Sequence, residues 1–184
     1  MVTGENAGTW GTKTNTNLNI LEQIIGGYST KSIAGGAQTT ALTVVDGNTT
    51  GTAQFRMIEF TGTITGNQIV TIPNDIETFY FLRNSTSGAY TVQFKYATGS
   101  GSSSTFTATD KGDKLIIATA NDGTNPDIKE VSLASPPGGS NTQVQFNNSG
   151  SFGGSANLVW DGSNLNIGAQ GDLRLQDSTG GEYI

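Results

Sequence analysis

The sequence contains no cysteine and no histidine. Without cysteine there is no thiol nucleophile, no disulfide, and no zinc or iron–sulfur site built on thiolates. Without histidine there is no Ser-His-Asp triad, no imidazole base and no histidine-bound metal. These two absences argue against many catalytic and metal-binding designs. They leave stability to packing within the chain or to contacts with partner chains.

Charge is also scarce, because charged residues are 13% of the chain, against roughly 25% in an average soluble protein. The formal net charge is −6 and the nine basic residues are thinly spread, so we expect no nucleic-acid partner. The longest apolar runs are about four residues, as at 115–118, and predict no membrane insertion. No secretion signal is visible, since the N-terminus lacks a basic segment followed by an apolar one.

Polar uncharged residues dominate the chain. Gly, Thr, Ser and Asn together make up 85 of the 184 residues. Glycine and asparagine favour turns, whereas threonine and the scattered Val, Ile, Phe and Tyr favour strands. The composition therefore predicts an all-β protein of short strands joined by many turns.

Residues 1–35 carry the one convincing helix pattern. Five apolar residues recur there at steps of three and four, namely Leu18, Ile20, Leu21, Ile24 and Ile25. Cap residues stand at both ends, with Thr14, Asn15 or Thr16 at the start and Gly26-Gly27 at the end. A helix of about ten residues is unstable alone in water. Its apolar stripe is therefore expected to pack on the following domain or on other chains.

Residues 36–135 are predicted to form one β domain. Turn signals separate the candidate strands, which are residues 41–45, 54–65, 68–72, 76–83, 89–97, 104–107, 113–120 and 127–133. The clearest alternation is in Tyr90, Val92, Phe94 and Tyr96, whose side chains are expected to share one core face. Short strands at this spacing predict a small antiparallel β-sandwich or jelly-roll-like domain.

Residues 136–184 change character after Pro136-Pro137-Gly138-Gly139. Only very short strand-like pieces follow, at residues 143–146, 157–160, 164–167 and 172–175. Such strands are too short to bury an apolar face within one chain. They gain stability by stacking on repeats or on other copies of the chain. The last residues resemble the middle of a strand, so we expect a longer polypeptide to continue beyond them.

Two stretches resemble parts of tailed-bacteriophage fibres. Residues 8–23, GTWGTKTNTNLNILEQ, resemble the N-terminal motif of phage tail fibres and other virion appendages. Three segments near the C-terminus resemble fibre-shaft repeats, especially those of marine phages: GSNTQVQFNNSG at 139–150, NLVWDGSNLNIG at 157–168 and DLRLQDSTGGEY at 172–183. The domain between the two stretches is not placed by any motif.

The resemblance implies a homotrimeric fibre with no catalytic residues in these zones. Its N-terminal end would attach to phage tail or adaptor proteins, and its distal part would meet a receptor on the host surface. The docking or oligomer contacts would be Trp10, Leu18, Leu21, Ile24 and Ile25. In the shaft, Phe146 and Trp160 are expected to pack between chains, since they are large apolar side chains in otherwise polar repeats.

Several loops are candidate chemical sites. Residues 122–127 cluster oxygen atoms that could bind Ca²⁺, although their composition is that of a turn. Asp110 and Asp113 flank a predicted hairpin turn, and residues 99–104 are predicted to be a loop tip. Trp10 and Tyr90 could stack on sugars, but core or interface positions are favoured for both. No carboxylate pair has the setting of a glycosidase site, so we expect no enzyme and no cofactor.

The predicted function is thus that of a structural phage virion protein. Residues 1–35 would anchor the fibre, residues 36–135 would form the β domain, and residues 136–184 would begin the trimeric β-rich shaft. Two alternatives remain open on the sequence: a head fibre or decoration protein, and a carbohydrate-binding adhesin module. The expected location is the virion, as part of a tail fibre.

Overall fold

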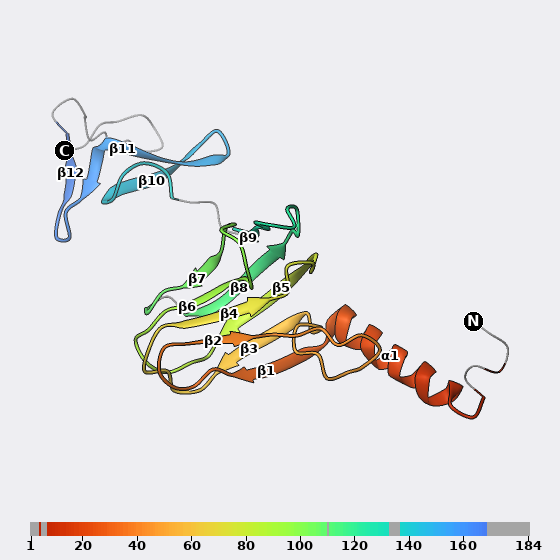
Figure 1. Cartoon of the computed structure of the whole chain (residues 1–184). Helices are drawn as coiled ribbons and strands as arrows, with labels where there is room; N and C mark the ends of the chain where they lie inside the picture. Colours follow the sequence, from red (N-terminus) through yellow and green to blue (C-terminus); the bar gives the residue numbers. More distant parts are fainter. Residues whose placement is uncertain (1–3, 5–6, 110, 133–136, 169–184) are drawn as a thin grey trace. The chain divides into compact units, whose positions relative to one another are not determined.

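The computed structural model describes residues 4, 7–109, 111–132 and 137–168. The chain divides into two compact units, Met1–Val131 and Ser132–Ile184, and each is described by itself. The described residues are mostly β, with one N-terminal helix and three sheets (Figure 1). The composition-based prediction of a β-rich protein is confirmed at this level.

The helix α1 spans Trp10–Gly26, 17 residues, and none of them is buried. It is longer than the predicted ten residues because it begins at Trp10. The expected cap at residues 14–16 is therefore wrong: Thr16 lies within the helix and donates its hydroxyl to the carbonyl of Thr12, 3.0 Å away. The predicted end is confirmed. A Cβ on Gly27 would lie 2.6 Å from the Cα of Gln23, so only glycine fits at this exit.

The first unit contains two sheets (Figure 1). The five-stranded sheet consists, in spatial order, of β1 (Tyr28–Ser32), β3 (Met57–Thr61), β5 (Thr78–Asn84), β8 (Gly112–Ala118) and β9 (Ile128–Glu130). The four-stranded sheet consists of β2 (Gln38–Ala41), β4 (Gln68–Ile72), β6 (Val92–Tyr96) and β7 (Ser104–Phe106). From β1 to β6 the chain thus passes back and forth between the two sheets and winds as a coil. β7 then stays on the four-stranded sheet, and β8 and β9 complete the five-stranded sheet.

Parallel pairing is the main departure from expectation. In the described part of the first unit, β1, β3 and β5 pair in parallel, as do β2, β4 and β6, and antiparallel pairs appear where β7, β8 and β9 are added. The predicted antiparallel sandwich is therefore wrong in its strand pairing. Alternation along a strand reports which face is buried. It does not report the direction of the neighbouring strand.

The corners of the coil are also hydrogen-bonded from one turn to the next. The amide of Gly35 donates to the carbonyl of Thr63 at 3.0 Å, and that of Ser87 donates to Gly62 at 3.0 Å. Gly88 has φ +100°, and a Cβ there would lie 2.1 Å from the carbonyl oxygen of Ile64. Gly88 therefore meets both demands of the corner, a positive φ and a close approach of two backbones.

The core lies between the two sheets of the coil. Phe94 of β6 contacts Phe60 and Tyr80 from the opposite sheet, with ring centroids 6.4 and 5.7 Å apart. The buried hydroxyl of Tyr80 donates to the carbonyl of Ala53 at 2.9 Å, and burial raises the pKa of this phenol. At a corner, the buried amide of Gln68 donates to the carbonyls of Gly36 and Gly66. These contacts fix the separation of the sheets.

The second unit contains a three-stranded antiparallel sheet. Its strands are β10 (Gln143–Asn148), β11 (Ser151–Trp160) and β12 (Leu165–Ile167), in that order across the sheet. No residue of this unit in the range 137–168 is buried. The sheet therefore has no core of its own among these residues.

Agreement with the predicted strands varies along the chain. Residues 68–72 coincide with β4, and most other predictions overlap a strand but misjudge its ends. The prediction for 41–45 is displaced, because β2 ends at Ala41. β1 was not predicted and lies in the segment assigned to the anchor, yet it pairs with β3. The predicted strand at 172–175 lies outside the described residues.

Candidate docking surfaces

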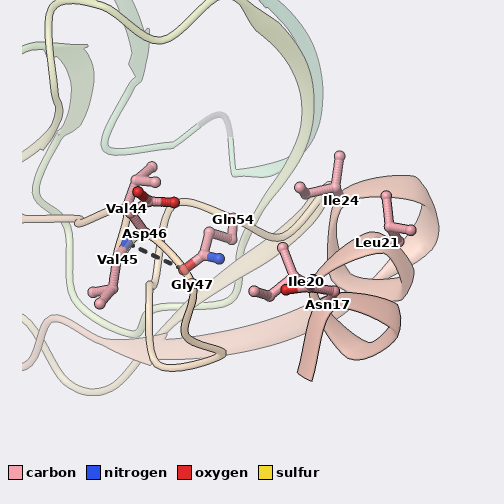
Figure 2. A pocket seen from close by; sticks show the side chains of 9 residues that line it. All are labelled: Asn17, Ile20, Leu21, Ile24, Val44, Val45, Asp46, Gly47 and Gln54. Atoms are coloured by element: carbon pink, nitrogen blue, oxygen red, sulfur yellow. Dashed lines mark hydrogen bonds between the residues drawn. The ribbon is translucent and has the colours of Figure 1, made fainter. Parts of the chain in front are cut away.

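One side of α1 packs against its own unit. Gln23 donates from its side-chain amide to the carbonyl of Thr49 at 3.1 Å. A pocket of about 410 Å³ lies between the helix and the loop after β2, as Figure 2 shows. The helix lines it with Asn17, Ile20, Leu21 and Ile24, and the chain beyond β2 lines it with Val44, Val45, Asp46, Gly47 and Gln54. The packing of α1 at this pocket is loose, since no residue of the helix is buried.

Three large apolar side chains of α1 lie outside this pocket and are mostly exposed. We call them the outer stripe: Trp10 is 69% exposed, Leu18 57% and Ile25 76%. Leu21 is 50% exposed and lines the pocket, so it lies between the stripe and the packed side. The predicted docking group is thus divided by the structure. Ile24, which is half-buried, and Leu21 line the pocket, whereas the outer stripe lies outside it. A helix with this much exposed apolar surface is typical of one that meets a partner.

A second exposed apolar surface lies on the outer face of the five-stranded sheet and was missed in the sequence. We call it the aromatic face. Its members are Tyr28, Met57, Phe79, Phe81, Leu115 and Ile117, of which Phe81 is 49% and Phe79 46% exposed. The signal was the run Phe79–Leu82, in which both alternating sets are apolar. Such a run is typical of a strand covered on both faces.

A charged row borders the aromatic face. Arg83 forms two hydrogen bonds with Asp113, 2.7 and 2.9 Å long, and this ion pair is solvent-exposed. Hydrogen bonding to Asp113 raises the pKa of Arg83, and the same bond lowers the pKa of Asp113. Glu59 accepts hydrogen bonds from Ser85 and Tyr28, which lower the pKa of this carboxyl. The charged side chains of this row therefore have hydrogen-bond partners within the chain.

The two predicted shaft residues lie in different parts of the second unit's sheet. Trp160 is directly opposite Leu165 across β11 and β12, and Leu158 is opposite Ile167, so these four share one face. Trp160 is 49% and Leu165 55% exposed. Phe146 is opposite Gly153 near the other end of β11 and is 47% exposed. Both predicted residues are thus available for contacts, but they do not contact each other.

The candidate chemical loops have the hydrogen bonds of ordinary turns. Asp122 accepts bonds from the amides of Thr124 and Asn125, and Asp127 accepts one from Ser102. Tyr90 lies before β6 and is 38% exposed, so its predicted place in the core face is wrong. Asp110 lies outside the described residues.

Two kinds of site are not found in the part of the chain that the structure describes. It contains no group of three or more acidic side chains placed to hold a metal ion. Its helix is too short and too polar to cross a membrane.

Comparison with known proteins adds no relative to this picture. No family model matches the chain, and neither the curated proteins nor the solved structures contain a match.

Proposed function

We propose that this protein is a structural component of a phage virion, the N-terminal part of a homotrimeric tail fibre. The resemblance of residues 8–23 and 139–183 to fibre proteins supports this assignment. In this proposed fibre, α1 attaches the chain to tail or adaptor proteins. The two-sheet coil of residues 28–130, which we call the coil domain, forms the base, and the second unit begins the shaft. The shaft then projects the distal part toward a host receptor.

The observation that carries the proposal is the absence of buried residues between positions 137 and 168. A sheet that buries no side chain gains little hydrophobic free energy to offset the conformational entropy lost on folding. Trp160, Leu165 and Ile167 nevertheless form an apolar face on it. Three copies that turn this face toward a common axis bury it and remove the exposed edges.

The outer stripe supports the anchoring role of α1. Trp10, Leu18 and Ile25 contribute little to the folded chain because most of their surface is exposed. Their burial by a partner removes this apolar surface from water, at roughly 25 cal/mol per Å². The stripe is therefore suited to contact a tail or adaptor protein.

Deletion of residues 1–26 tests the anchoring role in assembled particles. It removes α1 but keeps Gly27, whose carbonyl accepts a hydrogen bond from the amide of Met57. We expect a soluble trimer, measured by light scattering, that is missing from purified particles. Incorporation at the normal level would overturn the anchor assignment.

Electron microscopy of particles with a labelled chain tests the location. Density at the tail is the expected result. Density on the head would instead favour a head fibre or decoration protein, and no density on the particle would contradict a virion role.

A further inference from the structure

The two sheets of the coil present contrasting outer faces to their surroundings. On the four-stranded sheet the outward positions are mostly polar: Thr39, Ala41, Ile69, Thr71, Gln93, Lys95 and Thr105, of which Thr71 is buried. On the five-stranded sheet they form the aromatic face. Both sheets share one core and the same coil turns, so the difference is not required by folding. A large apolar outer face on only one sheet indicates a partner there.

The register places the aromatic face in two adjacent rows. Tyr28, Met57, Phe81 and Leu115 are neighbours across four strands, and Phe79 and Ile117 are neighbours in the next row. Phe79 and Phe81 meet edge to face with centroids 6.2 Å apart, and Arg56 lies over the Phe79 ring. Two hollows of about 330 and 370 Å³ flank these rings. Hollows of this size can receive side chains of a partner.

The charges on this face are balanced. Its outward charged strand positions are Glu59, Arg83, Asp113 and Lys129, two of each sign, on a chain of net charge −6. Arg56 over the Phe79 ring and Glu77 at the hollow beside it add one charge of each sign. Because Arg83 is paired with Asp113 within the chain, identical faces can approach without like-charge repulsion. The same pairing leaves few free polar groups to bind sugar hydroxyls. The observations therefore favour a protein partner over a glycan.

We propose that the aromatic face packs against the coil domains of the other copies of this chain in the assembled fibre. This inference rests on the homotrimer of the proposed function and adds a second interface to that of the shaft. A ring of three copies turns the same face of each toward the others. The trimer is then held at its base as well as along its shaft, and the four-stranded sheet keeps its polar outer face in water.

Single cysteines test the proposal in the full-length chain, which has none of its own. Met57→Cys lies in the aromatic face, and Thr39→Cys lies on the outer face of the other sheet as the matched control. Maleimide labelling is measured on the native protein, with its mass measured by light scattering. We expect a trimer in which position 57 reacts at least about tenfold more slowly than position 39, and equal rates after unfolding.

The outcomes separate this inference from the proposed function. Equal native labelling rates in a trimer overturn the inference and leave the homotrimer standing. A monomer overturns both. Slow labelling at position 57 that appears only after a host polysaccharide is added would assign the face to a glycan and overturn the inference.

A charge reversal gives an independent measurement. Arg83→Glu breaks the pair with Asp113 and places three carboxylates in one row, next to Glu59. Lys95→Glu changes the net charge equally on the polar face of the other sheet. We expect Arg83→Glu to weaken trimer assembly at least about tenfold on dilution, and Lys95→Glu to leave it unchanged. Equal effects of the two variants would contradict the proposal.

Discussion

The two units of this chain solve the problem of burying apolar side chains in different ways. The coil domain encloses 17 buried hydrophobic residues between two sheets. The three-stranded sheet of the second unit buries none among residues 137–168, although Phe146, Phe152, Trp160 and Leu165 are all large and apolar. The first unit can therefore be stable as a single chain, whereas the second needs surface supplied by others. The predictions below test this difference.

The largest effect is expected from Phe94→Ala in the core of the coil domain. Phe94 is fully buried against rings from the opposite sheet. Its truncation should cost about 3–5 kcal/mol of unfolding free energy, independent of protein concentration. Hydrogen exchange at the amides of β4 and β6 measures this loss. Lys95→Ala on the next residue is the control, with a change within about 0.5 kcal/mol.

Trp160→Ala probes the second unit in the same way. In a single chain this half-exposed side chain would matter little. If copies bury it, the trimer should lose about 2 kcal/mol or more per chain, and its melting temperature should fall further on dilution. Tyr90→Ala, an exposed aromatic residue of the coil domain, is the control. Unchanged trimer mass and melting temperature in Trp160→Ala would show that the second unit is not completed by other copies.

The two sides of α1 allow a sharper test within the first unit. Leu18→Ser combined with Ile25→Ser changes only the outer stripe, so the stability of the coil domain should stay within about 0.5 kcal/mol. Incorporation into particles should nevertheless be lost. Ile24→Ser, on the pocket side, should loosen α1 from the loop at residues 44–47 and raise its hydrogen exchange. Normal incorporation of the double variant would exclude the outer stripe as the docking contact.

The smallest effect concerns the turn between β11 and β12. Asp161 accepts hydrogen bonds from the Asn166 side chain and from the amides of Asn164 and Ser163, which lower its pKa to about 2. A lowered pKa stabilises the folded turn above the unfolded value near 3.8, and this contribution is lost as the pH falls toward 2. An NMR titration of the Asp161 carboxyl measures it. Asn166→Ala should raise that pKa, and an unchanged value would contradict the role of the Asn166 bond.

Alternation along the sequence predicted which side chains of a strand are buried. Val92, Phe94 and Tyr96 alternate with polar residues, and they form β6 with a buried inner face. β1 was missed because its half-buried positions, Ser29 and Lys31, are polar. It is held mainly by its pairing with β3, a contact between segments almost 30 residues apart. No local pattern reports such a contact.

Local sequence patterns likewise predicted only part of the candidate sites. Spacing found the apolar residues of α1, since helical periodicity is a property of neighbouring positions. It could not separate Ile24, which faces the pocket, from Leu18 and Ile25, which face outward. That division depends on where the loop after β2 lies. The aromatic face was missed because its residues come from four strands.

The sequence by itself determined that this protein is mostly β and that its one described helix ends before Gly27. It also indicated a C-terminal segment without a core of its own, as residues 137–168 show. Composition, periodicity and turn residues act over a few neighbouring positions, so they can be read along the chain. Only the tertiary structure decided that the strands wind as a parallel coil and that one outer face is aromatic. These features arise from pairing between distant segments, where hydrogen-bond direction and register place side chains that the sequence keeps apart.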